Sequence, residues 1–91
     1  KIPIIVEKGK HKSTPNISKN KFLVPDDLTV GQFLTVLRKR IELSEEEALF
    51  LFINGSILPP TSALLSQLYA AHKDVDNFMY MTYCCENTFG H

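Results

Sequence analysis

The C-terminal residues of the chain, CCENTFGH, contain the residue types that could do chemistry. Phe89, Gly90 and His91 close the sequence, and Gly90 belongs either to a loose chain end or to the reactive end of the molecule. Glycine makes up roughly 7% of average sequences, so its presence alone does not decide between these interpretations. The decision depends on the segments that precede the tail.

Cysteine and histidine are the other residues that could carry a reaction. Cys84 and Cys85 are adjacent and therefore poor disulfide partners, and without a second cysteine pair they form no zinc-binding pattern. His11 and His72 have no second metal-binding side chain at a suitable spacing, which favours surface positions for both. A hydrolase pair of Cys84 or Cys85 with His72 would need an oriented base and an oxyanion site, and no surrounding motif indicates either. The sequence predicts no enzyme, no metal and no cofactor.

Size and composition indicate one small domain. The chain has 91 residues, 44% of them hydrophobic, which is near the lower limit at which one core is stable without disulfides or metal. No apolar run approaches the roughly 20 residues that cross a bilayer, and the N-terminus does not resemble a signal peptide. We therefore expect a soluble protein of the reducing cytoplasm. The chain begins without Met inside a predicted strand, which favours a truncated or processed N-terminus.

The net charge is zero, but the charges are unevenly distributed. Residues 1–40 hold nine of the ten Lys and Arg against three acids, a charge of +6, and residues 41–91 carry −6. This asymmetry indicates a basic face that attracts an acidic partner, with solvated charges as the alternative. Nucleic acid is not expected, because the basic residues lack aromatic interleaving and a nucleic-acid-binding motif.

Periodicity in the first half predicts two strands and one helix. Segments 2–6 and 19–25 are short β-branched or apolar runs joined by a polar loop. Thr29 followed by Gln32 forms a capping-box pattern, and the apolar spacing after it predicts a helix over 30–41.

The second half predicts strands over 48–53 and 78–83, with a short helix over 61–71 between them, starting at Thr61 or Ser62. The first of these strands ends at Asn54-Gly55, a strong hairpin signal, and a short strand comes after it. This order predicts an α+β fold of the β-grasp (ubiquitin-like) type, in which a mixed sheet of four to five strands wraps around one main helix, with a short second helix. We divide the chain into a ubiquitin-like domain over 1–83 and a flexible tail over 84–91.

Two apolar surfaces exceed what such a core needs. The first and last strands are apolar on both faces, and because one helix covers only one face, the other is expected to meet a partner or a missing segment. On the helix, Phe33, Val36 and Arg40 lie about 90° from the main apolar stripe. These residues either form one wall of a pocket for an apolar side chain or widen the core stripe.

Four blocks then carry a resemblance to a known family: KFLVPDDLTVGQFLTVLRKRI, ALFLFINGSILPPTSALLSQLY, HKDVDNFMYMTY and ENTFG. In order and over nearly all 91 residues, they resemble the ubiquitin-like modifiers of autophagy, the family that includes GABA-receptor-associated protein and the microtubule-associated protein light chains. Members of that family carry about two further short helices before the residues that match Lys1. The resemblance implies that those helices cover the open sheet face, and this sequence lacks them.

The resemblance implies conjugation to a lipid through Gly90. In the family a cysteine protease removes the residues after this glycine, and activating and conjugating enzymes carry its carboxylate as thioesters to the amine of phosphatidylethanolamine. His91 would then be the residue that the protease removes. The alternative is that His91 is a remnant added to the chain. Glycine suits this chemistry because it has no Cβ, and a two-chain lipid gives lasting attachment. The implied locations are the cytoplasm and, once lipidated, the autophagosome membrane.

The resemblance also implies binding of short motifs in cargo receptors and adaptors: an aromatic residue, any two residues, then an aliphatic one, often with acids beside them. Such a peptide adds as a strand along the second strand of the domain, where Lys19 and Lys21 would meet the acids. The implied aromatic pocket is lined by Pro3, Ile5, Lys21, Leu23 and Phe78. The implied aliphatic pocket is lined by Phe22, Val24, Pro25, Phe33, Val36 and Arg40. A non-conjugated ubiquitin-fold peptide-binding module, which would share this groove without using Gly90, is the alternative.

Overall fold

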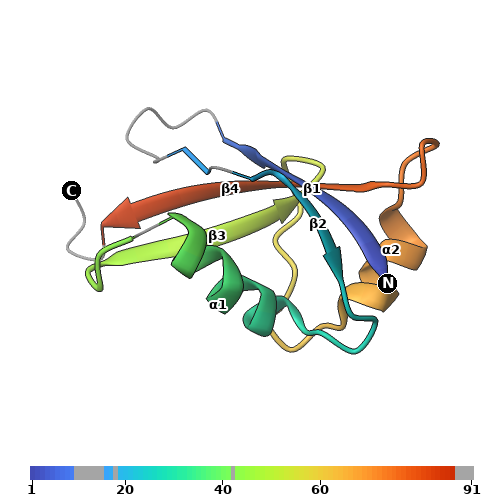
Figure 1. Cartoon of the computed structure of the whole chain (residues 1–91), viewed down its shortest axis with the longest axis horizontal. Coiled ribbons are helices and arrows are strands. Elements are labelled where there is room, and N and C mark those ends of the chain that lie inside the picture. The colour runs from blue at the N-terminus through green and yellow to red at the C-terminus, as the bar shows by residue number, and fades with distance from the viewer. Residues whose placement is uncertain (10–15, 18, 42, 88–91) are drawn as a thin grey trace.

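The computed structural model describes residues 1–9, 16–17, 19–41 and 43–87 of the chain (Figure 1). It contains a mixed four-stranded sheet and two helices. In chain order the elements are β1 (Ile2–Lys8), β2 (Lys21–Val24), α1 (Val30–Ile41), β3 (Glu47–Ile53), α2 (Leu65–His72) and β4 (Met79–Asn87). The predicted β-grasp fold with one main helix and a short second helix is therefore confirmed. The short strand predicted after Asn54-Gly55 is reduced to an isolated bridge between Ile53 and Ile57.

The strand order is β2-β1-β4-β3, so β2 and β3 form the two edges of the sheet (Figure 1). β1 and β4 are parallel neighbours in the centre, and each edge strand pairs antiparallel with one of them. Parallel strands need a long crossover connection, and here it includes α1, which packs on one face of the sheet.

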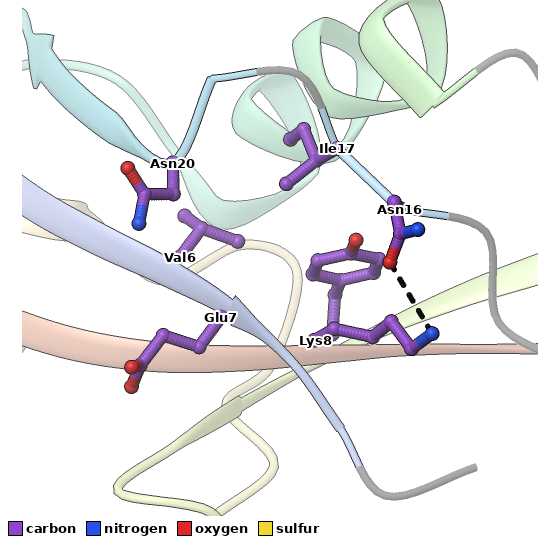
Figure 2. A pocket seen from close by; sticks show the side chains of 7 residues that line it. Val6, Glu7, Lys8, Asn16, Ile17 and Asn20 are labelled. Atoms are coloured by element: carbon purple, nitrogen blue, oxygen red, sulfur yellow. Dashed lines mark hydrogen bonds between the residues drawn. The ribbon is translucent and has the colours of Figure 1, made fainter. Parts of the chain in front are cut away.

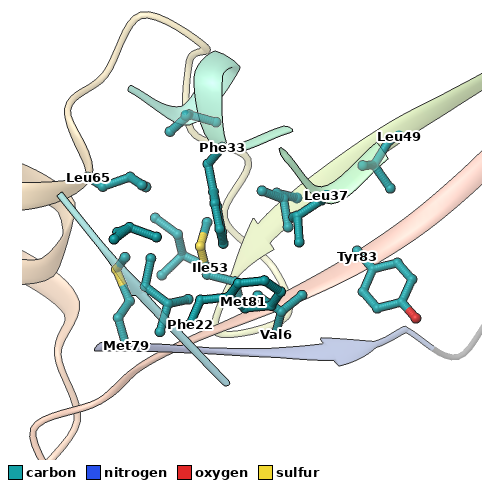
Figure 3. Packing of buried hydrophobic residues seen from close by; sticks show 14 of the residues in the cluster. Val6, Phe22, Phe33, Leu37, Leu49, Ile53, Leu65, Met79, Met81 and Tyr83 are labelled. Atoms are coloured by element: carbon teal, nitrogen blue, oxygen red, sulfur yellow. The ribbon is translucent and has the colours of Figure 1, made fainter. Parts of the chain in front are cut away.

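Alternate strand residues form one core with α1 (Figure 3). Because side chains of a strand alternate between its faces, every second residue of each strand points toward the helix. From α1, Phe33 and Leu37 reach into this layer and are fully buried. The strand residues buried against them are Ile2, Ile4, Val6, Phe22, Val24, Leu49, Leu51, Ile53, Met79, Met81, Tyr83 and Cys85.

The N-terminus of α1 is fixed in the way that the sequence predicts. The Thr29 N–H donates to Gln32 Oε1 at 2.9 Å, and the Gln32 N–H donates to Thr29 Oγ1 at 3.2 Å, which is a capping box. The N–H groups of Val30 and Gly31 donate to carbonyls of the 61–63 segment, both at 2.9 Å. The predicted start of the second helix at Thr61 or Ser62 is wrong because this segment is a loop that caps α1.

The last strand is longer than predicted. Its apolar pattern predicted an end at Tyr83, but β4 continues to Asn87 and pairs residues 84–87 with residues 47–50 of β3. Cys85 lies on the helix face at 3% exposure and contributes to the core. The predicted flexible tail over 84–91 is therefore wrong for its first four residues, and residues 88–91 lie outside the described part.

The face of the sheet opposite α1 is apolar and less covered. Ile5, Phe50, Phe52 and Tyr80 lie on it and are half-buried, whereas their neighbours on the helix face are at most 8% exposed. This agrees with the prediction that one helix covers only one of two apolar faces. Within the described residues, neither helix is long and apolar enough to cross a membrane.

Candidate functional site

The outer edge of β2 presents unused backbone groups. The Val6 N–H donates to the Asn20 carbonyl at 2.7 Å, so Asn20 faces β1. In an antiparallel pair this direction alternates, so Phe22 and Val24 also face β1. The N–H and C=O groups of Lys21 and Leu23 therefore point out of the sheet, where an added strand could pair with them.

The five residues predicted to line the aromatic pocket lie together on the open face beside this edge. Lys21 pairs with Ile5, and Leu23 pairs with Pro3, so each pair sits side by side across β2 and β1. The Lys21 ammonium lies 5.0 Å from the centroid of the Phe78 ring, which joins the residue before β4 to the same patch. Leu23 is 65% exposed and is the most accessible apolar side chain of the group.

The residues predicted to line the aliphatic pocket divide into two sets. Phe22 and Val24 are each 5% exposed, and Phe33 is fully buried with its ring edge-to-face on Phe22 at 5.5 Å. The burial of Phe33 favours the interpretation in which this residue widens the apolar core stripe of α1, and not the one in which it forms a pocket wall. Pro25, Val36 and Arg40 are exposed, so they are the members of this predicted pocket that a peptide could contact.

Positive charge flanks the β2 edge on both faces of the sheet. The Lys19 ammonium lies 5.5 Å from the centroid of the Phe22 ring, whose side chain is on the helix face, while Lys21 lies on the open face. A cation over an aromatic ring is attracted to it yet keeps its charge at the surface. The edge is thus suited to a peptide with carboxylates beside its apolar residues.

A hydrogen-bonded turn positions Phe78, and it was not predicted from the sequence. Asp76 Oδ1 accepts the Phe78 N–H at 3.0 Å, and Asp76 Oδ2 accepts the Tyr80 hydroxyl. The hydrogen bond from Tyr80, followed by that from Phe78, lowers the pKa of Asp76, and the same bond to Asp76 raises the pKa of Tyr80 to about 12. The signal that could have found it is an Asp two residues before Phe78, the spacing of an Asx turn.

The two cysteines lie on opposite faces of β4. Cys84 is half-buried on the open face, and Cys85 is buried on the helix face. Burial raises the pKa of both thiols, that of Cys85 to about 11, whereas a nucleophilic cysteine needs a lowered pKa. Among the described residues, no group of His, Cys, Asp and Glu is placed to hold a metal ion.

A cavity of about 450 Å³ is lined by residues other than those predicted to bind a peptide (Figure 2). It lies between the end of β1 and the segment before β2, where the Lys8 ammonium donates to Asn16 Oδ1 at 3.3 Å. Its lining is formed by Val6, Glu7, Lys8, Asn16, Ile17, Asn20 and Tyr83. The predicted peptide site is the outer edge of β2, with Pro3, Ile5 and Phe78 beside it on the open face of the sheet.

The predicted conjugation residues Phe89, Gly90 and His91 lie outside the described residues. What the structure places is the chain that leads to them: β4 ends at Asn87, at the end of the sheet away from α2 (Figure 1). Gly90 comes three residues later in the sequence.

Comparison with known proteins decides the family. The model of the family described as "Autophagy protein Atg8 ubiquitin like" matches residues 1–90. The chain belongs to the Atg8 family. Autophagy-related protein 8B of Oryza sativa subsp. japonica and Autophagy-related protein 8a of Arabidopsis thaliana are each 58% identical over 90 residues, which is 99% of this chain and 75% and 73% of theirs.

A solved structure of the Atg8 family agrees with the fold. The crystal structure of Trypanosoma brucei ATG8 matches with a TM-score of 0.87 at 48% identity, over 98% of this chain and 76% of that one. The chain spans about three quarters of the length of these relatives. The resemblance to this family that the sequence analysis found is thereby confirmed.

Proposed function

We propose that this chain is a ubiquitin-like modifier of autophagy that is joined through Gly90 to phosphatidylethanolamine on autophagosomal membranes. Membership of the Atg8 family supports this role. A cysteine protease would hydrolyse the peptide bond after Gly90 and release His91. The activating enzyme would use ATP to join the freed Gly90 carboxylate to AMP, its own cysteine thiol would displace the AMP to form a thioester, and a cysteine of the conjugating enzyme would take over the glycine by thioester exchange. In the last step the lipid amine attacks the thioester carbonyl, an amide bond forms, and the enzyme's cysteine leaves as a thiol.

We further propose that the β2 edge recruits cargo receptors and adaptors through motifs in which any two residues separate an aromatic from an aliphatic one. The observation that carries this proposal is the outward direction of the Lys21 and Leu23 backbone groups, beside the patch of Pro3, Ile5 and Phe78. An added peptide strand would gain main-chain hydrogen bonds there, and its side chains would enter the patches. Lys19 and Lys21 would meet the acids that accompany such motifs. In its free form the protein would act from the cytoplasm.

The conjugation proposal is tested with Gly90→Ala in the full chain. Incubated with ATP, the family's protease, activating enzyme, conjugating enzyme and vesicles containing phosphatidylethanolamine, the unchanged chain should lose His91 and carry the lipid in amide linkage at Gly90. Gly90→Ala should give no adduct, because a Cβ on the reacting residue obstructs the narrow enzyme channels. Binding of a motif peptide should be equal for both chains.

Two results would contradict conjugation. One is a covalent lipid adduct of equal yield on Gly90→Ala. The other is no adduct on either chain while motif peptides still bind, and that outcome would favour the alternative of a non-conjugated peptide-binding module.

A further inference from the structure

Ser44 is followed directly by three acids, Glu45, Glu46 and Glu47. Among the Ser and Thr residues of the chain, only Ser44 has a carboxylate within the three residues that follow it. Protein kinases distinguish substrates by such charge patterns, because acids after the serine are attracted to Lys and Arg in the peptide-binding groove of the kinase. The sequence around Ser44 therefore matches the needs of a serine kinase that is directed by acids.

The structure presents this segment at the surface, between α1 and β3 (Figure 1). Ser44, Glu45 and Glu46 are exposed, and residues 45–46 form a turn. The Ser44 hydroxyl donates to Glu47 Oε1 at 3.2 Å, and the Glu47 N–H donates to the Ser44 carbonyl at 3.2 Å. Water can replace bonds between exposed groups at a net cost of only about 1 kcal/mol each. A kinase can therefore reach the hydroxyl without opening the core.

Arg38 connects this turn to α1. Its Nη2 donates to the Ser44 carbonyl at 3.1 Å, and its Nη1 donates to the Glu47 carbonyl at 2.8 Å. Both acceptors are neutral, whereas the hydrogen bonds between a guanidinium and a phosphate are charge-assisted and roughly twice as strong. A phosphate on Ser44 would therefore compete with the Glu47 carbonyl for Arg38.

The start of β3 lies directly after this turn, where Ala48 pairs with Glu86 of β4. The Asn54 N–H donates to the Tyr80 carbonyl at 3.1 Å, so Asn54 faces β4. Because the direction alternates along the strand, Ala48 also faces β4, while every second residue faces the open edge of β3. The amide of Ala48 therefore reports whether this end of the β3–β4 pair is closed.

We propose that Ser44 is a phosphorylation site for a serine kinase that recognises acids after the serine, and that its phosphate opens the turn before β3. The Ser44 Oγ attacks the γ-phosphorus of ATP, an O–P bond forms as the bond to the β,γ-bridging oxygen breaks, and ADP leaves. The hydroxyl proton passes to the catalytic aspartate of the kinase. The phosphoserine cannot donate to the Glu47 carboxylate and repels it, and it attracts Arg38.

The modification is tested on the full chain with ATP and two purified kinases. Casein kinase 2 is directed by acids, and protein kinase A, which is directed by basic residues, is the control. Mass spectrometry of the peptides should locate one phosphate on Ser44 after treatment with casein kinase 2, and none on Ser44 after treatment with protein kinase A. Ser44→Ala should receive no phosphate from casein kinase 2.

The role of the acids is tested with two double variants of equal net charge. Glu45→Gln with Glu47→Gln removes two of the acids after Ser44 and should slow phosphorylation by casein kinase 2 at least about tenfold. Asp26→Asn with Asp27→Asn removes two exposed acids from the other half of the chain and is the matched control. This control should be phosphorylated as fast as the unchanged chain.

The opening of the turn is measured by hydrogen exchange in the phosphorylated chain. The amide of Ala48 should exchange about threefold faster than in the unmodified chain, because repulsion from Glu47 and the loss of Arg38 both loosen the start of β3. The amide of Phe22, which faces β1 at the far edge of the sheet, should exchange equally in both forms. In Arg38→Gln the phosphate should change the exchange of Ala48 less, because one of its two effects is absent.

Four results would overturn this proposal. They are the lack of a phosphate on Ser44 after casein kinase 2, equal modification of Ser44 by protein kinase A, equal rates for the two double variants, and equal exchange of Ala48 with and without the phosphate. Amide spectra check that each variant is folded. None of these measurements involves Gly90, so their failure leaves the conjugation proposal intact.

Discussion

At the scale of single residues, Phe33 shows why helical spacing alone could not assign the aliphatic pocket. Its position about 90° from the main stripe is compatible with a pocket wall and with a wide core face. The structure places its ring on Phe22 in the core, because the twisted sheet brings β2 against that flank of α1. Val36, one turn further on, is the flank residue that stays accessible at 39% exposure.

This difference predicts opposite effects of the same substitution at the two positions. Phe33→Asp places a charge in the core and should remove at least the roughly 3–5 kcal/mol that truncation of a buried Phe costs, enough to unfold a small domain. Val36→Asp should change stability by less than about 1 kcal/mol but weaken an acidic motif peptide. Urea denaturation and calorimetry measure the two effects. A stable Phe33→Asp protein would contradict the assignment of Phe33 to the core.

The Asp76–Tyr80 pair predicts a titration that is measurable at one residue. Tyr80 with its raised pKa favours the folded state below pH 10, and this contribution is lost as pH rises from 10 toward about 12. Asp76 has a lowered pKa in the folded state, so it stabilises the fold at pH values above the ordinary pKa of Asp. This stabilisation is lost as the pH falls through the lowered pKa of Asp76. In Asp76→Asn, an NMR pH titration of the Tyr80 ring signals should report a lower pKa for Tyr80. An unchanged Tyr80 titration would contradict the hydrogen bond.

At the scale of elements, the sequence predicted which helices and strands exist better than where they end. The helix over 30–41 is correct because its capping box and its apolar period are both local signals. The end of β4 was missed because Cys84 and Cys85 are adjacent and chemically alike, which hides the alternation between faces. Only the long-range pairing with residues 47–50 of β3 shows that the strand continues.

The outward direction of the β2 backbone allows a test that removes one outward N–H group. Leu23→Pro deletes an N–H that points away from β1, so it costs no ladder hydrogen bond, and proline is tolerated at such edge positions. Motif peptides should bind about tenfold more weakly or worse, with a modest loss of stability. Leu23→Ala is the matched control: it also removes the Leu23 side chain but keeps the outward N–H, so it should bind the peptide more tightly than Leu23→Pro. Undiminished peptide affinity of Leu23→Pro would contradict strand addition at β2.

At the scale of the whole molecule, the central parallel pair of β1 and β4 supports two antiparallel edges and carries the chain toward the C-terminal glycine. The residues of the predicted aromatic pocket are scattered from Pro3 to Phe78 in sequence, and the sheet brings them side by side. Composition and spacing predicted neither this convergence nor the open β3 edge, because both depend on strand order. The family resemblance supplied the convergence of the pocket residues. The open β3 edge follows from the directions of the backbone groups.

The proposed function depends most on Gly90 as the residue that is conjugated. The direct measurement is mass spectrometry of the C-terminal peptide from the native protein, recovered separately from membranes and from the soluble fraction. We predict a peptide that ends at Gly90 in both fractions, with phosphatidylethanolamine in amide linkage to it on the membranes. A C-terminus that retains His91 in every fraction, with no lipid-modified form, would contradict conjugation at Gly90.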